Sequence, residues 1–245
     1  MSIYMLKTFS LTDIGKNRAM NQDFMFASDE PIGKLPNLYI VADGMGGHKA
    51  GGYASKYAVE TIVDEIRHSI EEEPVAVLQK AMQAANVAVL QKALEEDSMK
   101  GMGTTIVLAT FIEEQAIIAN VGDSRCYRIN TEMNQITKDH SFVEEMVRLG
   151  GLSREQAWNH PNKNVITRAL GVEMEMEIDF FQENIGKDDM FMLCSDGLTN
   201  MIDDCKMKEI LQQDRTVEQK AVELVDVANK HGGRDNITVI LMKPL

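Results

Sequence analysis

The sequence predicts an α+β fold in which antiparallel sheets are covered by helices. Short runs rich in Ile, Val, Tyr, Phe and Thr recur along the chain, and this composition is typical of β-strands. Longer stretches, with apolar residues three and four positions apart as in amphipathic helices, lie between groups of these runs. Because the helices arrive in groups rather than after every strand, the pattern favours α+β layers over a regular βαβ sheet.

The strand-like runs are spread over the whole chain. They cover residues 7–12, 23–27, 38–42, 104–111, 116–121, 125–129, 190–194 and 237–242. Two long helices are expected after the third run, at residues 52–70 and 74–94, with Pro74 in the first turn of the second helix. A further helix at residues 216–230 precedes the last strand and has one apolar face, formed by Val217, Ala221, Leu224, Val225 and Ala228.

Residues 141–171 have mixed periodicity. The segment is polar and contains glycine, so we expect a mobile, partly helical excursion on the surface that flanks a functional site. No linker, repeat or low-complexity tract divides the 245 residues, and we expect a single domain.

Composition excludes several classes of protein. With 44% hydrophobic residues the chain can bury a sizeable core, yet no apolar run approaches the roughly 18 residues of a membrane-spanning helix. Lys7 interrupts the apolar N-terminal residues, so we expect no cleaved signal and a cytoplasmic location. Cys126, Cys194 and Cys205 are odd in number and lack CxxC spacing, so we expect buried thiols rather than disulfides or a zinc site.

The formal net charge of -13 bears on both partners and chemistry. Nucleic acids and anionic membranes are bound by clustered Lys and Arg, so neither is expected as a partner. An excess of acidic residues makes a protein soluble, and part of it can also form a carboxylate cluster that binds cations. The positions of the acidic residues decide between these explanations.

Four aspartates stand at the ends of strand-like runs. Asp43, Asp123 and Asp196 each follow an apolar run at a tight turn, and Asp235 comes just before the last strand. Ordinary turn chemistry explains any one of them. Neighbouring strand ends would bring all four carboxylates together, where like charges cannot all stay ionised without cations.

The ligand type indicates which cations would bind there. Carboxylate oxygens suit Mg²⁺ or Mn²⁺, and the sequence has no HExxH motif or Cys/His cluster that would favour zinc. A pair of such ions roughly 4 Å apart lowers the pKa of a bridging water and clamps a phosphate. The cluster therefore predicts phosphoryl chemistry.

Two further segments fit this chemistry. A glycine-rich stretch follows Asp43, but the GxxxxGK[ST] and GxGxxG spacings of nucleotide-binding loops are absent. Glycines there let the backbone, including the Gly44 carbonyl, approach a metal closely. Near the N-terminus, Arg18 is either an exposed charge or a phosphate-binding group, since a guanidinium matches phosphate oxygens.

Short motifs follow one another in a specific order. They read Arg18-x-x-Asn21-Gln22-Asp23, Val41-Ala42-Asp43-Gly44-Met45-Gly46-Gly47-His48, Gly101-Met102-Gly103-Thr104-Thr105, Val121-Gly122-Asp123-Ser124-Arg125, Leu193-Cys194-Ser195-Asp196-Gly197-Leu198 and Gly233-Arg234-Asp235-Asn236-Ile237-Thr238. In this order, over essentially the whole chain, they resemble the metal-dependent protein phosphatases, the type 2C serine/threonine family, in their short bacterial form. The resemblance implies an α-β-β-α sandwich of two antiparallel sheets flanked by helices, with serine/threonine protein phosphatase activity.

The resemblance also implies a binuclear Mn²⁺ or Mg²⁺ centre, with a possible third ion, at one end of the sandwich. Its implied ligands are Asp23, Asp43, Gly44, Asp123, Asp196 and Asp235. Asp43 bridges the two ions, while the Gly44 carbonyl binds one of them. Asp196 and Asp235 complete the other. Asp23 supports the centre through water, and Asp123 with Asp196 matches the third position.

The remaining implications concern the substrate. Arg18 matches the phosphate-binding arginine, and residues 141–171 match a flap that influences substrate choice. Water activated by the ions would attack phosphorus in line, without a phospho-enzyme intermediate. The implied partners are phosphorylated proteins, including a cognate serine/threonine kinase, and we expect a monomer.

Two positions depart from the family pattern. Many members have a glutamate where this chain has Gln22, so we expect weaker metal affinity at that site. Eukaryotic members carry a histidine, proposed as general acid, where this chain has Met45. His48, three residues on, is either a proton donor or a structural histidine capping the glycine loop.

Other phosphatase mechanisms lack their motifs. A cysteine-dependent phosphatase needs an arginine six residues after its cysteine, whereas the residues six after Cys126, Cys194 and Cys205 are Glu132, Asn200 and Leu211. A haloacid dehalogenase-type enzyme needs a DxDx[TV] motif, and the chain has no Asp-x-Asp pair. Two alternatives remain open: a pseudophosphatase scaffold, and a metallohydrolase that acts on nucleotides or small phosphates.

Overall fold

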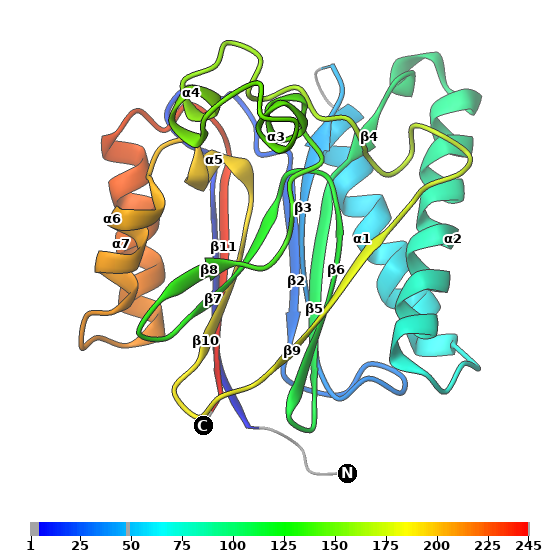
Figure 1. The fold of residues 1–245 in the computed structure, drawn as a ribbon. Helices are drawn as coiled ribbons and strands as arrows, with labels where there is room; N and C mark the ends of the chain where they lie inside the picture. The colour runs from blue at the N-terminus through cyan, green and yellow to red at the C-terminus, as the bar shows by residue number, and fades with distance from the viewer. Residues whose placement is uncertain (1–4, 48–49, 245) are drawn as a thin grey trace.

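Two antiparallel sheets stack face to face in the middle of the molecule (Figure 1). The structure, a computed structural model, describes residues 5–47 and 50–244. The first sheet has the order β1-β11-β10-β7-β8, with strands Leu6–Asp13, Ile237–Pro244, Met190–Cys194, Arg125–Ile129 and Met133–Gln135. The second has the order β2-β3-β5-β6-β9, with strands Asp23–Ser28, Leu38–Met45, Ile106–Ile112, Gln115–Val121 and Asp179–Asn184. A short strand, β4 (Gly103–Thr104), pairs with β3.

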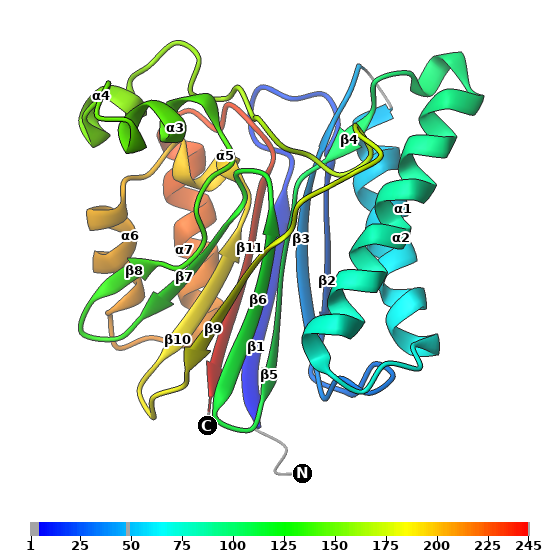
Figure 2. The same ribbon diagram turned by 45° about the vertical axis from the view of Figure 1, so that its right-hand side comes forward.

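Helices cover the outer face of each sheet (Figures 1 and 2). The second sheet is covered by α1 (Ala50–His68) and α2 (Pro74–Glu95), and the first by α6 (Asp204–Leu211) and α7 (Val217–Lys230). The predicted α-β-β-α sandwich is therefore confirmed. The remaining helices are short: η1 (Asp97–Met99), α3 (Phe142–Arg148), α4 (Arg154–Trp158) and α5 (Asp196–Thr199).

The core consists of three apolar layers, one between the sheets and one under each helical layer. Strand β3 shows why the sequence produces them. Leu38, Ile40 and Ala42 face α1 and α2, whereas Tyr39 and Val41 face the other sheet, because successive strand side chains point to opposite faces. A strand covered on both sides is apolar at consecutive positions, and this explains the continuous apolar run that precedes Asp43.

Several elements were not predicted from the sequence, and the burial of one cysteine was predicted wrongly. The polar strand β9 lies at a sheet edge, where one neighbour is missing and alternation is weak, and helix α6 was also not predicted. Cys126 and Cys194 are buried as expected. The expectation was wrong for Cys205, which is exposed because it lies on the outer side of α6.

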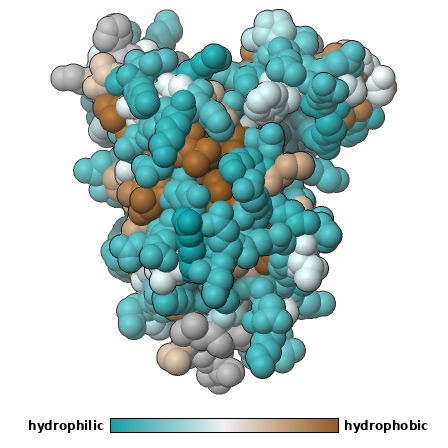
Figure 3. Space-filling view, turned by 90° about the vertical axis from the view of Figure 1, so that its left-hand side faces the viewer, coloured by the Kyte–Doolittle hydropathy of each residue, from teal (hydrophilic) through white to brown (hydrophobic). Residues whose placement is uncertain are grey.

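The surface over α6 and α7 is mostly hydrophilic, with apolar side chains gathered near the middle of this face and a few more scattered around it (Figure 3). Within residues 5–47 and 50–244, none of the helices is both long and apolar enough to cross a bilayer. The segment predicted as a surface excursion carries α3 and α4, which lie over the end of the sandwich opposite the chain termini (Figure 1). We call residues 141–171 the flap below.

Candidate metal centre

Five strand ends bring their aspartates to the flap end of the sandwich (Figure 1). Asp43 lies near the end of β3 and pairs in register with Asp23 at the start of β2. Asp123 follows β6, and Asp196 begins α5 directly beyond β10. Asp235 stands two residues before β11. Aspartates up to 212 residues apart in the chain, at positions 23 and 235, thus form one cluster.

Asp43 is at the centre of this cluster. Burial, followed by the negative charges of Asp23 and Asp196, raises the pKa of the Asp43 carboxyl group well above its usual value. Asp123 and Asp235 act in the same direction. The backbone fixes its position, because the Asp43 amide donates to Thr105 Oγ1 at 3.0 Å and its carbonyl oxygen accepts from the Thr105 amide at 2.9 Å.

Only one of the two carboxylate oxygens of Asp23 accepts hydrogen bonds. Its Oδ2 atom accepts hydrogen bonds from Ser195 and Thr238, both at 2.7 Å, whereas its Oδ1 atom is buried without a partner. Burial raises the pKa of Asp23 to about 7, although the two hydroxyl groups oppose the shift. A buried, unpartnered carboxylate oxygen is costly unless a cation or ordered water reaches it.

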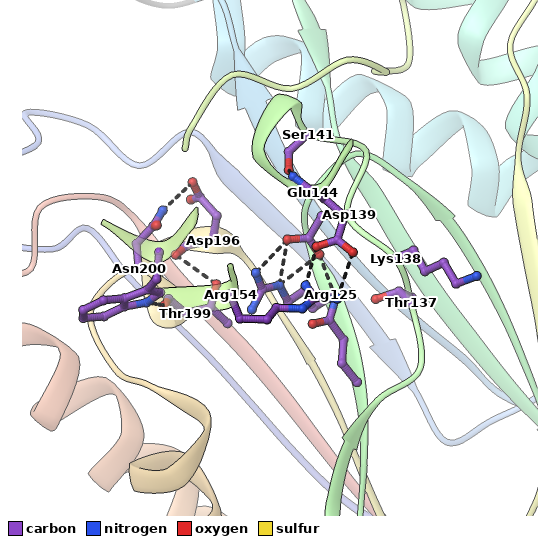
Figure 4. Close-up of polar contacts among 12 residues, drawn as sticks. Arg125, Thr137, Lys138, Asp139, Ser141, Glu144, Arg154, Asp196, Thr199 and Asn200 are labelled. Carbon is purple, nitrogen blue, oxygen red and sulfur yellow. Dashed lines mark hydrogen bonds and ion pairs between the residues drawn. The ribbon is translucent and has the colours of Figure 1, made fainter. Parts of the chain in front are cut away.

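Asp196 repeats this arrangement. Asn200 donates to its Oδ2 atom at 2.8 Å, one turn along α5, while its Oδ1 atom is buried without a partner (Figure 4). Burial and the nearby Asp235 charge raise the pKa of Asp196 to about 6, and the adjacent Asp43 carboxyl group acts in the opposite direction. Asp43 and Asp196 are therefore direct neighbours.

Asp123 occupies a more enclosed position. Burial, followed by the charges of Asp196 and Asp139, raises its pKa well above the usual value, and Arg125 partly offsets this. The Arg125 guanidinium binds Asp139 through two nitrogens, at 3.0 and 2.6 Å (Figure 4). Because Arg125 is also paired with Asp139, it offsets only part of the negative charge of the cluster.

Asp235 connects the cluster to Arg18. Arg18 Nη2 donates to Asp235 Oδ2 at 2.7 Å, and the Arg18 side chain is 46% exposed. The loop that carries Arg18 is held by Asn236, which donates to the carbonyl oxygens of Ile14 and Met20 at 2.9 and 3.0 Å. The structure therefore brings the predicted arginine to the open side of the cluster.

Gly44 is packed too tightly for any side chain. A Cβ atom at this position would lie 2.0 Å from the carbonyl oxygen of Gly51. Its amide donates to the Gln22 carbonyl at 3.1 Å, and the Gln22 side chain contacts the Gly46 carbonyl at 3.5 Å.

Met45 is the last residue of β3 and lines a separate surface pocket. The proposed roles of His48 fall outside the described residues.

The donor set fits divalent cations that prefer oxygen. Within the part of the chain that the structure describes, no three His, Cys, Asp or Glu side chains are placed to hold one ion unaided. Such a cage is what structural zinc needs, whereas Mg²⁺ and similar ions keep several waters and depend less on a complete set of protein ligands. The two unpartnered buried oxygens, on Asp23 and Asp196, fit that second pattern.

A pocket of about 550 Å³ opens beside the cluster, between the flap and α5. Asp123 and Asp196 of the cluster line it together with Trp158 and Lys163 of the flap. An ion pair between Arg154 and Glu144 joins α4 to α3 (Figure 4). The Trp158 indole donates to the Thr199 carbonyl oxygen at 3.3 Å, so the flap is docked on α5.

Sequence reasoning did not single out the residues that hold the aspartates in place. Besides Ser195, Asn200 and Asn236, these include His140, which accepts from the Gly122 amide at 3.0 Å and so holds the turn before Asp123. Burial lowers the pKa of His140, which keeps the ring neutral and able to accept. Ser195 and Asn236 do lie inside the quoted motifs, and their position beside aspartates was the available signal.

Comparison with known proteins gives consistent matches. Residues 15–241 match the family model of protein phosphatase 2C. The serine/threonine phosphatase stp of Listeria innocua is 44% identical over 241 residues, covering 95% of this chain and 93% of that relative. The crystal structure of the serine/threonine phosphatase Stp1 from Staphylococcus aureus has a TM-score of 0.92 at 34% identity, covering 98% and 96%. The catalytic domain of the serine/threonine protein phosphatase PstP, in complex with 2 manganese ions, has a TM-score of 0.86 at 32% identity, covering 97% of each chain.

Proposed function

Because this chain belongs to the protein phosphatase 2C family, we propose that its carboxylate cluster holds two divalent cations, Mn²⁺ or Mg²⁺, with room for a third beside Asp123. The chain is a metal-dependent serine/threonine protein phosphatase that acts on phosphorylated proteins. The observation that carries the cation assignment is the crowding of buried carboxylates around Asp43. The two manganese ions of the PstP relative support the number and kind of ion.

The proposed ligands are shared between the two cations. Asp43, central in the cluster, bridges both cations, and the Gly44 carbonyl oxygen completes one side. Asp196 and Asp235 hold the other side, and the free oxygen of Asp23 is available to an intervening water. When bound, the cations lower the pKa of water, polarise the phosphate and offset charge on its oxygens.

The chain's own residues orient the substrate. Arg18 is exposed on the open side of the cluster and uses one of its five N–H donors on Asp235, so the remaining donors can reach phosphate oxygens. Cys126 and Cys194 are buried in the core, and the exposed Cys205 has Leu211 rather than an arginine six residues on, so none of the three has the setting of a phosphatase nucleophile. We therefore propose direct attack by water, without a covalent phosphoryl-enzyme.

Protons and cations compete for the cluster, which gives a test of the cation assignment. The pKa values of Asp23 and Asp196 rise from 3.8 to about 7 and about 6. The folded metal-free protein thus binds these protons more tightly than the unfolded chain, so this contribution to stability is present below about pH 4 and is lost as pH rises through 6 to 7. Cation binding requires ionised carboxylates and therefore improves over the same range.

Saturating Mn²⁺ should raise the melting temperature by an amount that increases from pH 5 to pH 8. The expected slope is about 1 kcal/mol of unfolding free energy per pH unit for each displaced proton. Differential scanning calorimetry with and without Mn²⁺ at each pH measures it, and the metal-free samples serve as controls for other titrating groups. A difference that stays flat or shrinks as pH rises would place the cations elsewhere.

Arg18→Ala should lower kcat/KM by about a hundredfold while leaving Mn²⁺ affinity nearly unchanged, because the variant loses donors to the phosphate and keeps every proposed ligand. Arg18→Lys should recover only part of this loss, since a lysine cannot bind two phosphate oxygens with a fixed fork. Steady-state kinetics on a phosphothreonine peptide measures both, with the exposed Arg67→Ala as control. Equal losses in activity and Mn²⁺ affinity would assign Arg18 to the metal centre instead.

The biological setting is a further proposal. We propose that the chain acts as a cytoplasmic monomer on proteins phosphorylated by a cognate serine/threonine kinase. The three free cysteines suit a reducing compartment, and protein phosphatases depend on a kinase to supply their substrates. Sedimentation analysis of the purified chain and activity toward an autophosphorylated kinase test these two points.

A further inference from the structure

A basic pocket of about 630 Å³ adjoins the pocket beside Asp123 and shares lining residues with it. It is formed by the flap loop at residues 159–164, the segment between α5 and α6, and the turn before β11. Its titratable lining residues are His160, Lys163, Asp203, Lys206, His231 and Arg234. Three permanent cations and two histidines thus face a single carboxylate in a protein whose net charge is -13.

The cations of this pocket are poorly neutralised. Within the described residues, Lys163 and Arg234 form no ion pair, and Lys163 lies 5.2 Å from the centre of the Trp158 ring. Asp203 caps helix α6 by accepting from the Lys206 amide at 2.8 Å. The Lys206 ammonium contacts Glu209 on the same exposed helix face, and such a pair contributes little.

Burial and the nearby Arg234 charge also lower the pKa of Lys163, although Asp196 opposes them. Lys163 and Arg234 repel each other, and the ion pairs of the described residues include neither of them, so this part of the surface is electropositive. An anion that enters it gains charge-assisted hydrogen bonds and relieves the repulsion between the cations.

The basic pocket is continuous with the reacting end of the molecule. Arg234 directly precedes the proposed ligand Asp235. Asn200 lines both pockets and donates to Asp196 at 2.8 Å. Trp158 and Lys163 likewise line both pockets. A peptide advances about 3.3 Å per residue when extended, so residues close to the phosphorylated one in sequence can reach this pocket.

We propose that the basic pocket binds an anionic group of the substrate, a carboxylate or a second phosphate, that lies near the phosphorylated residue in sequence. The inference rests on the proposed phosphatase function and adds a preference for acidic or multiply phosphorylated segments. Arg234 and Lys163 are the primary contacts, because neither has an acidic partner, and Lys206 adds charge at the α6 side. The shared chemistry is an oxyanion, which both arginine and lysine bind.

The test compares phosphothreonine peptides that have the same core and differ in flanking residues. One peptide is neutral, others carry glutamates on the N- or C-terminal side, and another carries a second phosphothreonine. We expect kcat/KM to be roughly fivefold to tenfold higher for the best anionic peptide than for the neutral one at low salt. This advantage should fade as ionic strength rises. The glutamate and second-phosphate arms identify which anion is preferred.

The double variant Lys163→Gln/Lys206→Gln should lose most of this advantage. The advantage is measured as the ratio of kcat/KM for the anionic peptide to kcat/KM for the neutral peptide, so that a general effect of Lys163 on the pocket beside Asp123 cancels. The matched control is Lys138→Gln/Lys208→Gln, which removes the same charge from exposed and half-buried positions outside the pocket and should keep the advantage. The wild-type ratio and its salt dependence remain informative if the double variant fails to fold.

Equal hydrolysis of neutral and anionic peptides by the wild-type protein would overturn the inference and leave the phosphatase function intact. The same holds if both double variants lose the advantage equally, since the preference would then arise from overall charge. Failure to hydrolyse any peptide, or para-nitrophenyl phosphate, would instead contradict the proposed function itself.

Discussion

Asp43→Asn should lower kcat/KM by about a thousandfold, the largest effect of any single substitution that we expect. Asp43 is the central carboxylate of the cluster, and it is the ligand proposed to touch both cations. An amide keeps its shape and its packing but loses the negative charge and one acceptor. Initial rates on a phosphothreonine peptide over a range of Mn²⁺ concentrations measure the loss.

The same substitution should stabilise the metal-free protein against unfolding. Removing one buried negative charge relieves the repulsion among the aspartates, so metal-free Asp43→Asn should melt at a higher temperature than the metal-free wild type. Asp226→Asn, on the exposed face of α7, is the matched control and should change neither kcat/KM nor the melting temperature of the metal-free protein. If Asp43→Asn keeps near-normal activity, the ligands have been misplaced.

Gly44→Ala should reduce the free energy of unfolding by about 2 to 4 kcal/mol and abolish most activity. The added methyl group would lie 2.0 Å from the Gly51 carbonyl oxygen and 2.8 Å from that of Gln22. These are backbone atoms, so β3 and the start of α1 must separate to admit it. That movement displaces the Gly44 carbonyl, which is a proposed ligand, and the neighbouring Asp43.

Gly47→Ala is the matched control for this steric argument. A Cβ atom at Gly47 meets nothing within 4 Å, and the residue lies only three positions further along the chain. We expect its unfolding free energy to stay within about 0.5 kcal/mol of the wild type. Urea denaturation of both variants measures the difference. Equal behaviour of the two alanines would mean that the loop adapts freely and that close packing at Gly44 has no role.

Most of the architecture could be predicted from local patterns. The strands at β7 and β10 were predicted with the bounds that the structure shows. Strand β10 is a continuous apolar run, whereas β7 combines the strand-favouring Tyr127 and Ile129 with two arginines. The long helices α1, α2 and α7 were predicted within two residues at each end. In α7, Thr216 and Gln219 form a capping box that fixes the start of the helix.

Elements with weak patterns were missed. Strand β9 is polar at several positions because it lies at the edge of its sheet, and β8 has only three residues. Helix α6 is short, and its buried residues Met207, Ile210 and Leu211 follow two acidic residues that read as a loop.

The aspartates could be predicted but their neighbours could not. Asp43, Asp123, Asp196 and Asp235 each stand next to the end of an apolar strand-like run, and this position is visible in the sequence. The hydroxyl groups that hold Asp23, from Ser195 and Thr238, come from positions 172 and 215 residues away. Such contacts depend on sheet order and register, which a single sequence does not specify. The same holds for the basic pocket, whose cations come from three separate segments.

Release of phosphate from a phosphothreonine peptide, with Mn²⁺, with Mg²⁺ and with a chelator, tests the central claim most directly. Asp196→Asn is the companion variant, because Asp196 has a buried, unpartnered oxygen and lines the pocket beside the cluster. Release that requires a divalent cation, stops with the chelator and falls by orders of magnitude in Asp196→Asn is the predicted result. Release that persists with the chelator, or in Asp196→Asn, would contradict catalysis at this carboxylate cluster.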